Sequence, residues 1–314
     1  MPVDIQIVEV GPRDGLQIAK AIMPTSLKKR WIEEAVAAGI TEIEVCSFVP
    51  AKVVPGMQDA PEITRFAASL PGLTVAALIP NAKGGAAAIA AGAHKVSMPI
   101  SVSKSHNQAN LRKTHEQSLD ELRAVVAMAR DMPADRRPKI EVGLATSFGC
   151  SIEGVVPQDD VLRLAEKVLA AGAESVTASD TIGIGNPAQV RRLFTALFAA
   201  FGKERANSAH FHDTRGQGLA NVLAALDAGV TSFDACLAGL GGCPFAPGAS
   251  GNVCTEDVVW MLEEMGLKTG IDLAKLLEVR KVLVEGLPGE RLNGHVAEAG
   301  LARTRAIERV ATAR

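Results

Sequence analysis

Several residue types are scarce in this chain, and each absence excludes a class of protein. The 314 residues include no tyrosine, and aromatic residues make up only 4%, so platforms for stacking nucleic-acid bases are missing. The formal net charge is −2, and no basic stretch occurs, which also argues against a nucleic-acid partner. No apolar run is long enough to span a membrane. We therefore expect a soluble protein whose partner is neither a nucleic acid nor a membrane.

Cysteine usage and the chain ends bear on the compartment. The five cysteines are an odd number and show no Cys-x-x-Cys spacing, which fits a reducing environment better than a disulfide framework. The strand-like segment 5–10 begins almost at once, and residues 311–314 match no targeting signal. We expect no signal or transit peptide and predict a cytoplasmic location.

A turn of small residues recurs four times along the chain, each time between a helical stretch and a strand candidate. Glycine is favoured just after a helix because the left-handed backbone conformation costs it little. The four turns are at 38–40, 91–93, 171–173 and 228–230. We interpret them as four helix-to-strand junctions.

Eight strand candidates alternate with helical stretches of roughly 10–15 residues. The strand candidates are residues 5–10, 42–46, 74–79, 95–98, 139–145, 175–180, 208–213 and 232–237. This alternation predicts parallel βαβ units of the α/β class, and eight of them predict a (β/α)8 TIM barrel with extra C-terminal helices. An open doubly wound sheet is the alternative, but no Gly-x-Gly-x-x-Gly follows the first strand. We assign residues 1–285 to the barrel domain and 286–314 to a C-terminal helical extension.

The pair His210 and His212 closes the seventh strand candidate. Residues two apart on a strand face the same side of the sheet, so both imidazoles point the same way. Neutral imidazole is the commonest nitrogen ligand of metal ions. Two histidines alone are more often a hydrogen-bonded polar pair, so a metal site requires further ligands from elsewhere in the chain.

Further candidates lie at the carboxyl ends of the other strands, where a TIM barrel carries its active site. They are Arg13, Asp14 and Gln17 after the first strand, Glu44 on the second, Asp180 on the sixth, and Cys243, Asn252 and Glu256 after the eighth. Asp14 could instead cap a helix, and Asp180 could be a turn residue. Glu44 lies within a strand, where a charge needs water, an ion or a partner. The glycine-rich segment 238–252 fits a mobile lid with an exposed Cys243, although a phosphate cradle or a plain linker is open.

Three motifs together resemble the hydroxymethylglutaryl-CoA lyase family, part of a metal-dependent barrel group of lyases, aldolases and Claisen-condensing enzymes. They are VEVGPRDGLQ at 8–17, HFHDT at 210–214 and AGLGGCPFAPGASGN at 238–252. The resemblance keeps its order over residues 5–285. Its most specific piece is Gly242-Cys243-Pro244, which the condensing relatives lack.

The resemblance implies a carbon–carbon lyase that cleaves 3-hydroxy-3-methylglutaryl-CoA, or a closely related 3-hydroxyacyl-CoA, to acetyl-CoA and acetoacetate or the corresponding oxoacid. It also implies a small-molecule acyl-CoA as partner, a homo-oligomer, and a place in leucine degradation or ketone-body formation. By the same resemblance, the ligands of a divalent metal, Mg²⁺ or Mn²⁺, are Asp14, His210, His212 and Asn252. The catalytic or site positions are Arg13, Glu44, Asp180, Cys243 and Glu256, with Arg13 and Gln17 at the substrate.

The chemistry of the reaction fits these assignments. A cation lowers the pKa of the 3-hydroxyl that must lose its proton, with Asp180 or a water on the metal as the predicted base. Arg13 can stabilise the thioester enolate that forms when the C2–C3 bond breaks. Cys243 can then deliver the proton that converts the enolate to acetyl-CoA.

Alternatives concern the acyl group and the reaction. Residues 148–151, 98–103 and Arg215 depart from the pattern of the animal enzymes, which leaves open a different branched acyl group, such as a longer 3-substituted glutaryl-CoA or a methylmalyl-type thioester. Residues 103–107 either contact the substrate or form a solvated loop. A Claisen synthase or hydroxy-oxoacid aldolase on the same barrel is disfavoured by Gly242-Cys243-Pro244. A non-enzymatic scaffold would tolerate a substituted ligand position, and none is found.

Overall fold

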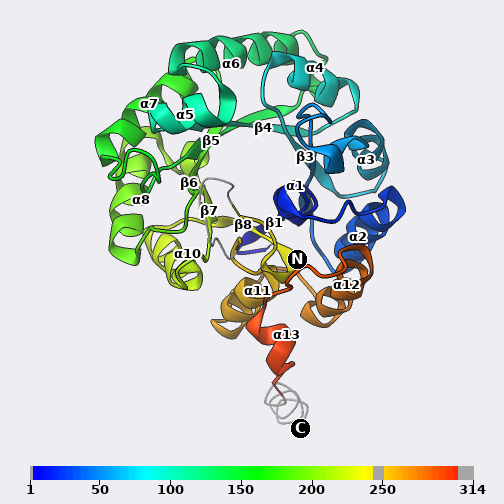
Figure 1. Ribbon diagram of the computed structural model, residues 1–314. Coiled ribbons are helices and arrows are strands. Elements are labelled where there is room, and N and C mark those ends of the chain that lie inside the picture. Colours follow the sequence, from blue (N-terminus) through cyan, green and yellow to red (C-terminus); the bar gives the residue numbers. More distant parts are fainter. Residues whose placement is uncertain (1–2, 243–250, 303–314) are drawn as a thin grey trace.

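The computed structural model describes residues 3–242 and 251–302. Its eight parallel strands close into a barrel in chain order, with β8 beside β1 (Figure 1). The strands are β1 Gln6–Glu9, β2 Glu42–Ser47, β3 Thr74–Leu78, β4 Lys95–Ser101, β5 Lys139–Ala145, β6 Ser175–Asp180, β7 Ser208–Phe211 and β8 Ser232–Ala235. This architecture confirms the predicted TIM barrel.

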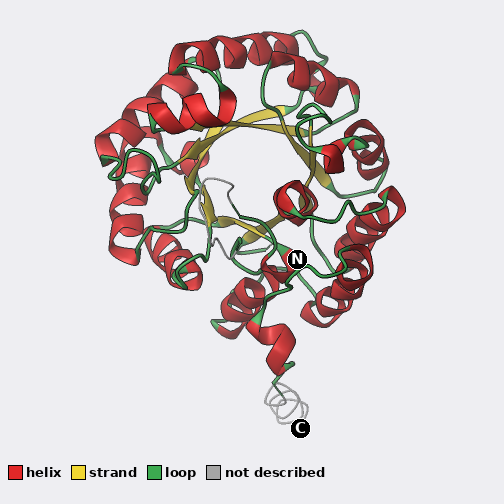
Figure 2. Ribbon diagram, viewed as in Figure 1, coloured by secondary structure: helices red, strands yellow, loops and turns green. Residues whose placement is uncertain are grey.

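Helices form an outer ring around the strands, as Figure 2 shows. The α-helices are α1 Leu16–Ile18, α2 Thr25–Ala37, α3 Ala60–Ala68, α4 Ala82–Ala90, α5 Lys104–Leu111, α6 His115–Arg130, α7 Gln158–Ala170, α8 Pro187–Phe201, α9 Lys203–Ala206, α10 Gly218–Ala228, α11 Thr255–Glu264, α12 Leu273–Gly286 and α13 His295–Ala299. Short turns are the π-helix η1 Gly11–Gly15 and the 3-10 helices η2 Pro55–Met57, η3 Ala134–Arg136 and η4 Leu237–Gly239. None of the helices in the described ranges is long and apolar enough to cross a membrane.

Local sequence signals explain where several of these elements begin and end. The predicted small-residue turns follow α2, α4, α7 and α10, and their glycines adopt positive φ, for example 104° at Gly39 and 108° at Gly172. Helix α6 begins with a capping box, in which Thr114 accepts from the backbone N–H of Gln117 and Gln117 accepts from that of Thr114. At the start of α8, the side-chain oxygen of Asn186 accepts from the backbone N–H of Gln189 and so caps the helix.

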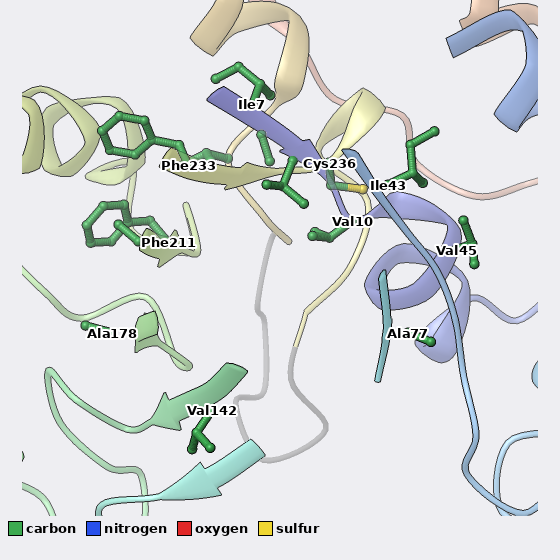
Figure 3. Close-up of a cluster of buried hydrophobic side chains, with 14 of the residues drawn as sticks. Ile7, Val10, Ile43, Val45, Ala77, Val142, Ala178, Phe211, Phe233 and Cys236 are labelled. Atoms are coloured by element: carbon green, nitrogen blue, oxygen red, sulfur yellow. The ribbon is translucent and has the colours of Figure 1, made fainter. Parts of the chain in front are cut away.

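The strands divide their side chains between a mostly apolar outer face and an inner face that carries charged as well as apolar residues. Ile7, Ile43, Phe211 and Phe233 point outward from the barrel and are buried against the helices (Figure 3). The opposite face carries charged residues among apolar ones such as Val8 and Leu78. There Lys95 Nζ lies 2.9 Å from Glu42 and 3.0 Å from Glu141, linking β2, β4 and β5. The centre of a TIM barrel is usually filled by apolar side chains, so this polar interior indicates a functional chamber.

Helices after the eighth strand pack on the outside of the barrel. Helix α12 lies against α2 and α11, and α13 lies against α11 at the lower edge of Figure 1. Helix α12 ends at Gly286, one residue beyond the barrel domain proposed from the sequence. Val296 of α13 is buried in the same core cluster as the barrel helices. The described part of the C-terminal extension therefore shares the core of the barrel.

Candidate metal centre and active-site cavity

A cavity of about 280 Å³ occupies the barrel interior and reaches the carboxyl ends of the strands. Most of the polar residues predicted at this end line it together. Its lining includes Arg13, Asp14, Gln17, Glu44, His210 and His212, and also Asp234, His106 and Gly242.

The turn after β1 carries Arg13 and Asp14 into this cavity. It is a single π-helical turn, in which the N–H of Leu16 donates to the carbonyl of Gly11, and the N–H of Asp14 donates to the carbonyl of Val10, just before the turn, at 2.7 Å. Glycine is required at its start, because a Cβ on Gly11 would lie 2.4 Å from Glu9 Oε1 and 2.6 Å from the ring of Trp31. Asp14 is therefore part of a helical turn, but its carboxylate faces the cavity instead of capping a helix.

Arg13 links two carboxylates on the cavity wall. Its Nε donates to Glu44 and its Nη1 donates to Asp14. Burial disfavours a charge on Arg13, but Asp14 and Glu44 outweigh it and raise its pKa. Burial would raise the pKa of Asp14, but Arg13, followed by the histidines, holds it far below its usual value. Burial keeps the pKa of Glu44 raised in spite of Arg13 and Ser97.

His210 and His212 face Asp14 across the cavity. Strand β7 ends at Phe211, so His212 lies just beyond it and forms an isolated antiparallel bridge with Asn252. The Nε2 atoms of the two histidines are 3.2 Å apart. Asp14 Oδ2 lies 3.6 Å from His212 Nε2 and 4.0 Å from His210 Nε2. One ligand atom from each of the three residues lies within 4.8 Å of the others.

The hydrogen bonds of the histidines fix where their lone pairs point. His212 Nδ1 lies 2.8 Å from the carbonyl oxygen of Thr181, which can only accept, so this nitrogen carries the proton. His210 Nδ1 is likewise 3.0 Å from Asp234 Oδ2. In the neutral rings both Nε2 atoms are then acceptors, and two lone pairs 3.2 Å apart repel each other unless a cation or an added proton lies between them.

Asn252 supplies the fourth group of the cluster. Its Nδ2 donates to Asp14 Oδ2 at 2.6 Å and to the carbonyl of Leu240 at 2.9 Å. Its Oδ1 is buried and has no hydrogen-bond partner within the described residues. A buried acceptor without a partner is costly, and a cation would satisfy it. Mixed oxygen and nitrogen donors of this kind fit a hard or borderline divalent ion.

Asp180 lies outside the cavity. It follows Ala178 on the outward face of β6, whereas Ser179 and Thr181 line the cavity. Both oxygens of Asp180 accept main-chain N–H groups, from Ile184 at 3.0 Å and Gly185 at 2.9 Å. Burial raises its pKa in spite of these bonds. The residue shapes the loop after β6, which matches the turn alternative more closely than the role of base.

Glu256 also lies away from the cavity, at the first turn of α11. It is fully buried, accepts from Arg280 Nη1, and accepts from the backbone N–H of Ala238 at 3.0 Å. The Cys254 thiol donates to it at 2.8 Å. Its contacts therefore hold the turn that leads into the glycine-rich segment, and the structure does not bring it to the metal cluster.

The remaining predicted residues divide into two cases. Gln17 lines the cavity, and its Oε1 is buried without a partner among residues 3–242 and 251–302, as expected for a group that binds substrate. Cys243 lies outside the described residues. Gly242, which precedes it in the sequence, lines the cavity. The other four cysteines are buried.

Sequence reasoning missed Asp234 and left His106 undecided. Asp234 on β8 holds the ring of His210, and the alternation of Ser232 and Asp234 with apolar Phe233 could have revealed its inward direction. Residues 103–107 are not a solvated loop but begin α5. His106 lies in its first turn, is buried, lines the cavity, and bonds Ser101 Oγ through Nδ1 at 2.8 Å.

Comparison with known proteins gives consistent matches over most of the chain. The family model described as HMGL-like matches residues 4–283. The hydroxymethylglutaryl-CoA lyase YngG of Bacillus subtilis is 41% identical over 284 residues, which are 90% of this chain and 93% of the relative. The mitochondrial hydroxymethylglutaryl-CoA lyase of Mus musculus is 40% identical over 95% of this chain and 90% of its own.

A solved structure agrees with these relatives. An HMG-CoA lyase from Acinetobacter baumannii, determined in complex with coenzyme A and 3-methylmalate, superposes with a TM-score of 0.88 at 40% identity. The match covers 94% of this chain and 95% of that protein. Motif, family model, sequence and structure thus lead to the same set of proteins.

Proposed function

This chain belongs to the HMGL-like family, and on that basis we propose that it is a carbon–carbon lyase that cleaves 3-hydroxy-3-methylglutaryl-CoA to acetyl-CoA and acetoacetate. The observation that carries the proposal is the convergence of Asp14, His210 and His212 in one cavity beside Arg13, with Asn252 hydrogen-bonded to Asp14. The four residues come from the turn after β1, the end of β7 and the segment after β8, and a structural barrel would not need them together.

The four residues would hold a divalent cation, and we propose Mg²⁺ or Mn²⁺ because oxygen donors equal the nitrogen donors in number. When bound, this cation would lower the pKa of the substrate 3-hydroxyl and orient the substrate oxygens. The hydrogen bonds of Asp234 and Thr181 to the two rings turn both Nε2 atoms toward that position.

Arg13 would stabilise the charge that develops during bond cleavage. The 3-hydroxyl gives its proton to a water in the cavity as the C2–C3 bond breaks, so C3 becomes the ketone of acetoacetate and the electron pair stays on C2, shared with the thioester oxygen as an enolate. Glu44 and Asp14 fix the plane of the guanidinium at the cavity wall, so it need not reorganise when the enolate forms. Gln17 would bind the substrate through its unpartnered Oε1.

Protonation of C2 completes the reaction, and Cys243 is the proposed donor. Gly242 lies at the cavity and Asn252 contacts Asp14, so the two ends of the segment that contains Cys243 lie at the site. A thiol on such a segment could give its proton to the enolate carbon and yield acetyl-CoA. Asp180 and Glu256 would support this chemistry only by shaping the loops around it.

The test is release of acetyl-CoA from purified protein with and without chelator. We expect cleavage of 3-hydroxy-3-methylglutaryl-CoA that chelator abolishes and added Mn²⁺ restores. Because the Acinetobacter baumannii relative was solved with 3-methylmalate, the panel should include 3-methylmalyl-CoA and a longer 3-substituted glutaryl-CoA. Inactivity on every thioester would refute the lyase proposal, and cleavage of only another thioester would correct the acyl group.

The role of Cys243 is tested with Cys243→Ala against Cys46→Ala. Cys46 is a buried thiol that bonds Thr64 and does not line the cavity. We expect the first variant to lose most of its turnover and the second to retain it. Equal activity of the two variants would contradict the proton-donor role. Three points stay predictions: the homo-oligomer, the cytoplasmic location and the place in leucine degradation. Analytical ultracentrifugation would measure the oligomeric state.

A further inference from the structure

Asp234 is the one carboxylate in the described residues that hydrogen-bonds an imidazole of the metal cluster without belonging to it. It lies on β8 directly beside His210 of β7 in the strand register. Paired residues on neighbouring strands point to the same side of a sheet, so both side chains face the cavity. Asp234 Oδ2 lies 3.0 Å from His210 Nδ1.

The two histidines are held in different ways. His212 Nδ1 donates to the main-chain carbonyl of Thr181, a group that no side-chain substitution removes. His210 depends on the side chain of Asp234, which is a charged acceptor and therefore makes a stronger hydrogen bond. The orientation of one ring is thus built into the backbone, and that of the other rests on a single residue.

The surroundings of Asp234 show why a carboxylate is tolerated there. Arg13 and Lys95 both interact electrostatically with it inside the barrel, and each also pairs with other carboxylates. The negative charge is therefore partly balanced before any cation binds. It is available to increase the electron-donating ability of the His210 ring, as carboxylate–histidine pairs do around protein-bound metals.

We propose that Asp234 is a positioning residue: it holds His210 in the tautomer and orientation that direct Nε2 at Asp14 and His212, and so strengthens the binding of the cation. The inference rests on the metal centre of the proposed function, but not on the identity of the substrate. Its test measures metal binding and not turnover, so a negative lyase assay would neither support nor refute it.

The experiment is calorimetric titration of the full chain, freed of metal by chelator, with Mn²⁺ alone. Asp234→Ala should weaken Mn²⁺ binding by about ten- to a hundredfold, the usual effect of removing such a partner. Asp234→Asn should weaken it less, because its amide oxygen can still accept from Nδ1–H. Glu141→Gln is the matched control, because it removes one negative charge from the same cavity. The Glu141 carboxylate bonds Lys95 and Ser175 and does not contact a proposed metal ligand.

Two results would overturn the proposal. One is wild-type Mn²⁺ affinity in Asp234→Ala. The other is equal weakening in Asp234→Ala and Glu141→Gln, which would mean that loss of charge, and not of the hydrogen bond to His210, is responsible. Asp234→Leu, which has a similar volume but no hydrogen-bond acceptor, takes the place of the Ala variant if that variant does not fold.

Nitrogen-15 NMR supplies a readout that a merely structural role would not move. At a pH at which its ring is neutral, His210 should be the Nδ1–H tautomer in the metal-free wild type and should shift toward the Nε2–H tautomer in Asp234→Ala. His212 should be unchanged, because Thr181 still accepts its proton. An Nε2–H tautomer of His210 in the wild type would contradict the positioning role.

Discussion

Glu9 is a fully buried carboxylate whose ionisation should make the fold less stable as the pH rises. It lies on the outward face of β1 and accepts from the N–H groups of Gly11 and Leu237, both at 2.9 Å, and from Thr255 Oγ1 at 2.7 Å. Burial raises its pKa from 4.5 to about 7, although the three hydrogen bonds lower it; the nearby Glu256 adds to the rise.

The size and sign of the effect follow from this pKa. At about 1.36 kcal/mol per pH unit, a pKa raised from 4.5 to about 7 corresponds to roughly 3 kcal/mol. Because the folded protein holds the proton more tightly than the unfolded chain, this stability is fully present below pH 4.5. It is lost as the pH rises to about 7, and about 2.5 kcal/mol of it should disappear between pH 5 and pH 8.

The assay is urea unfolding followed by circular dichroism between pH 5 and pH 8. Over this range the free energy of unfolding of Glu9→Gln should fall by about 2.5 kcal/mol less than that of the wild type. The difference between the two proteins cancels the titration of groups that they share. Glu166→Gln, an exposed residue on α7, is the control and should follow the wild type. Parallel curves for the wild type and Glu9→Gln would refute the reasoning.

Three further predictions concern the site and its supports. Asn252→Ala should weaken Mn²⁺ binding by at least about tenfold in calorimetry, because it removes the buried Oδ1 and the donor to Asp14; unchanged affinity would exclude Asn252 as a ligand. Arg280→Met should cost about 3 kcal/mol in urea unfolding, since Glu256 stays buried without its ion partner; adding Glu256→Gln should recover part of the loss. Gly11→Ala should cost about 1–3 kcal/mol, because its Cβ would overlap Glu9 and Trp31, whereas Gly56→Ala, whose nearest contact is 3.6 Å, should be nearly neutral.

The alternation of side chains along the strands explains where the structure places several of the predicted site residues. It correctly places His210 and His212 on one face, and Glu44 shares the inward face of β2 with Glu42. Applied to β6, the same rule puts Asp180 with Val176 and Ala178, which are outward and buried. A strand-end position was therefore not enough evidence for the role of base.

Other features depend on contacts that no local pattern contains. The pairing of Glu256 with Arg280 joins α11 to α12 across 24 residues of sequence, and nothing in either helix specifies it. The bond between Asp14 and Asn252 spans 238 residues. From the sequence, only the resemblance to a family indicates that Asp14 and Asn252 belong to one site. The structure gives the physical reason, because closure of the barrel brings β8 beside β1 and so the segments after these two strands together.

The outer face of the barrel fixes the geometry of the inner face. Glu9 accepts from Gly11, at the start of the turn that carries Asp14, and from Leu237, while Glu256 accepts from Ala238. Leu237 and Ala238 open the segment that ends at Asn252. Two buried carboxylates that never reach the cavity therefore hold the backbone from which two of the four proposed ligands extend. Metal affinity should accordingly respond to substitutions at positions that touch neither metal nor substrate, since a preorganised site depends on the residues that support its ligands.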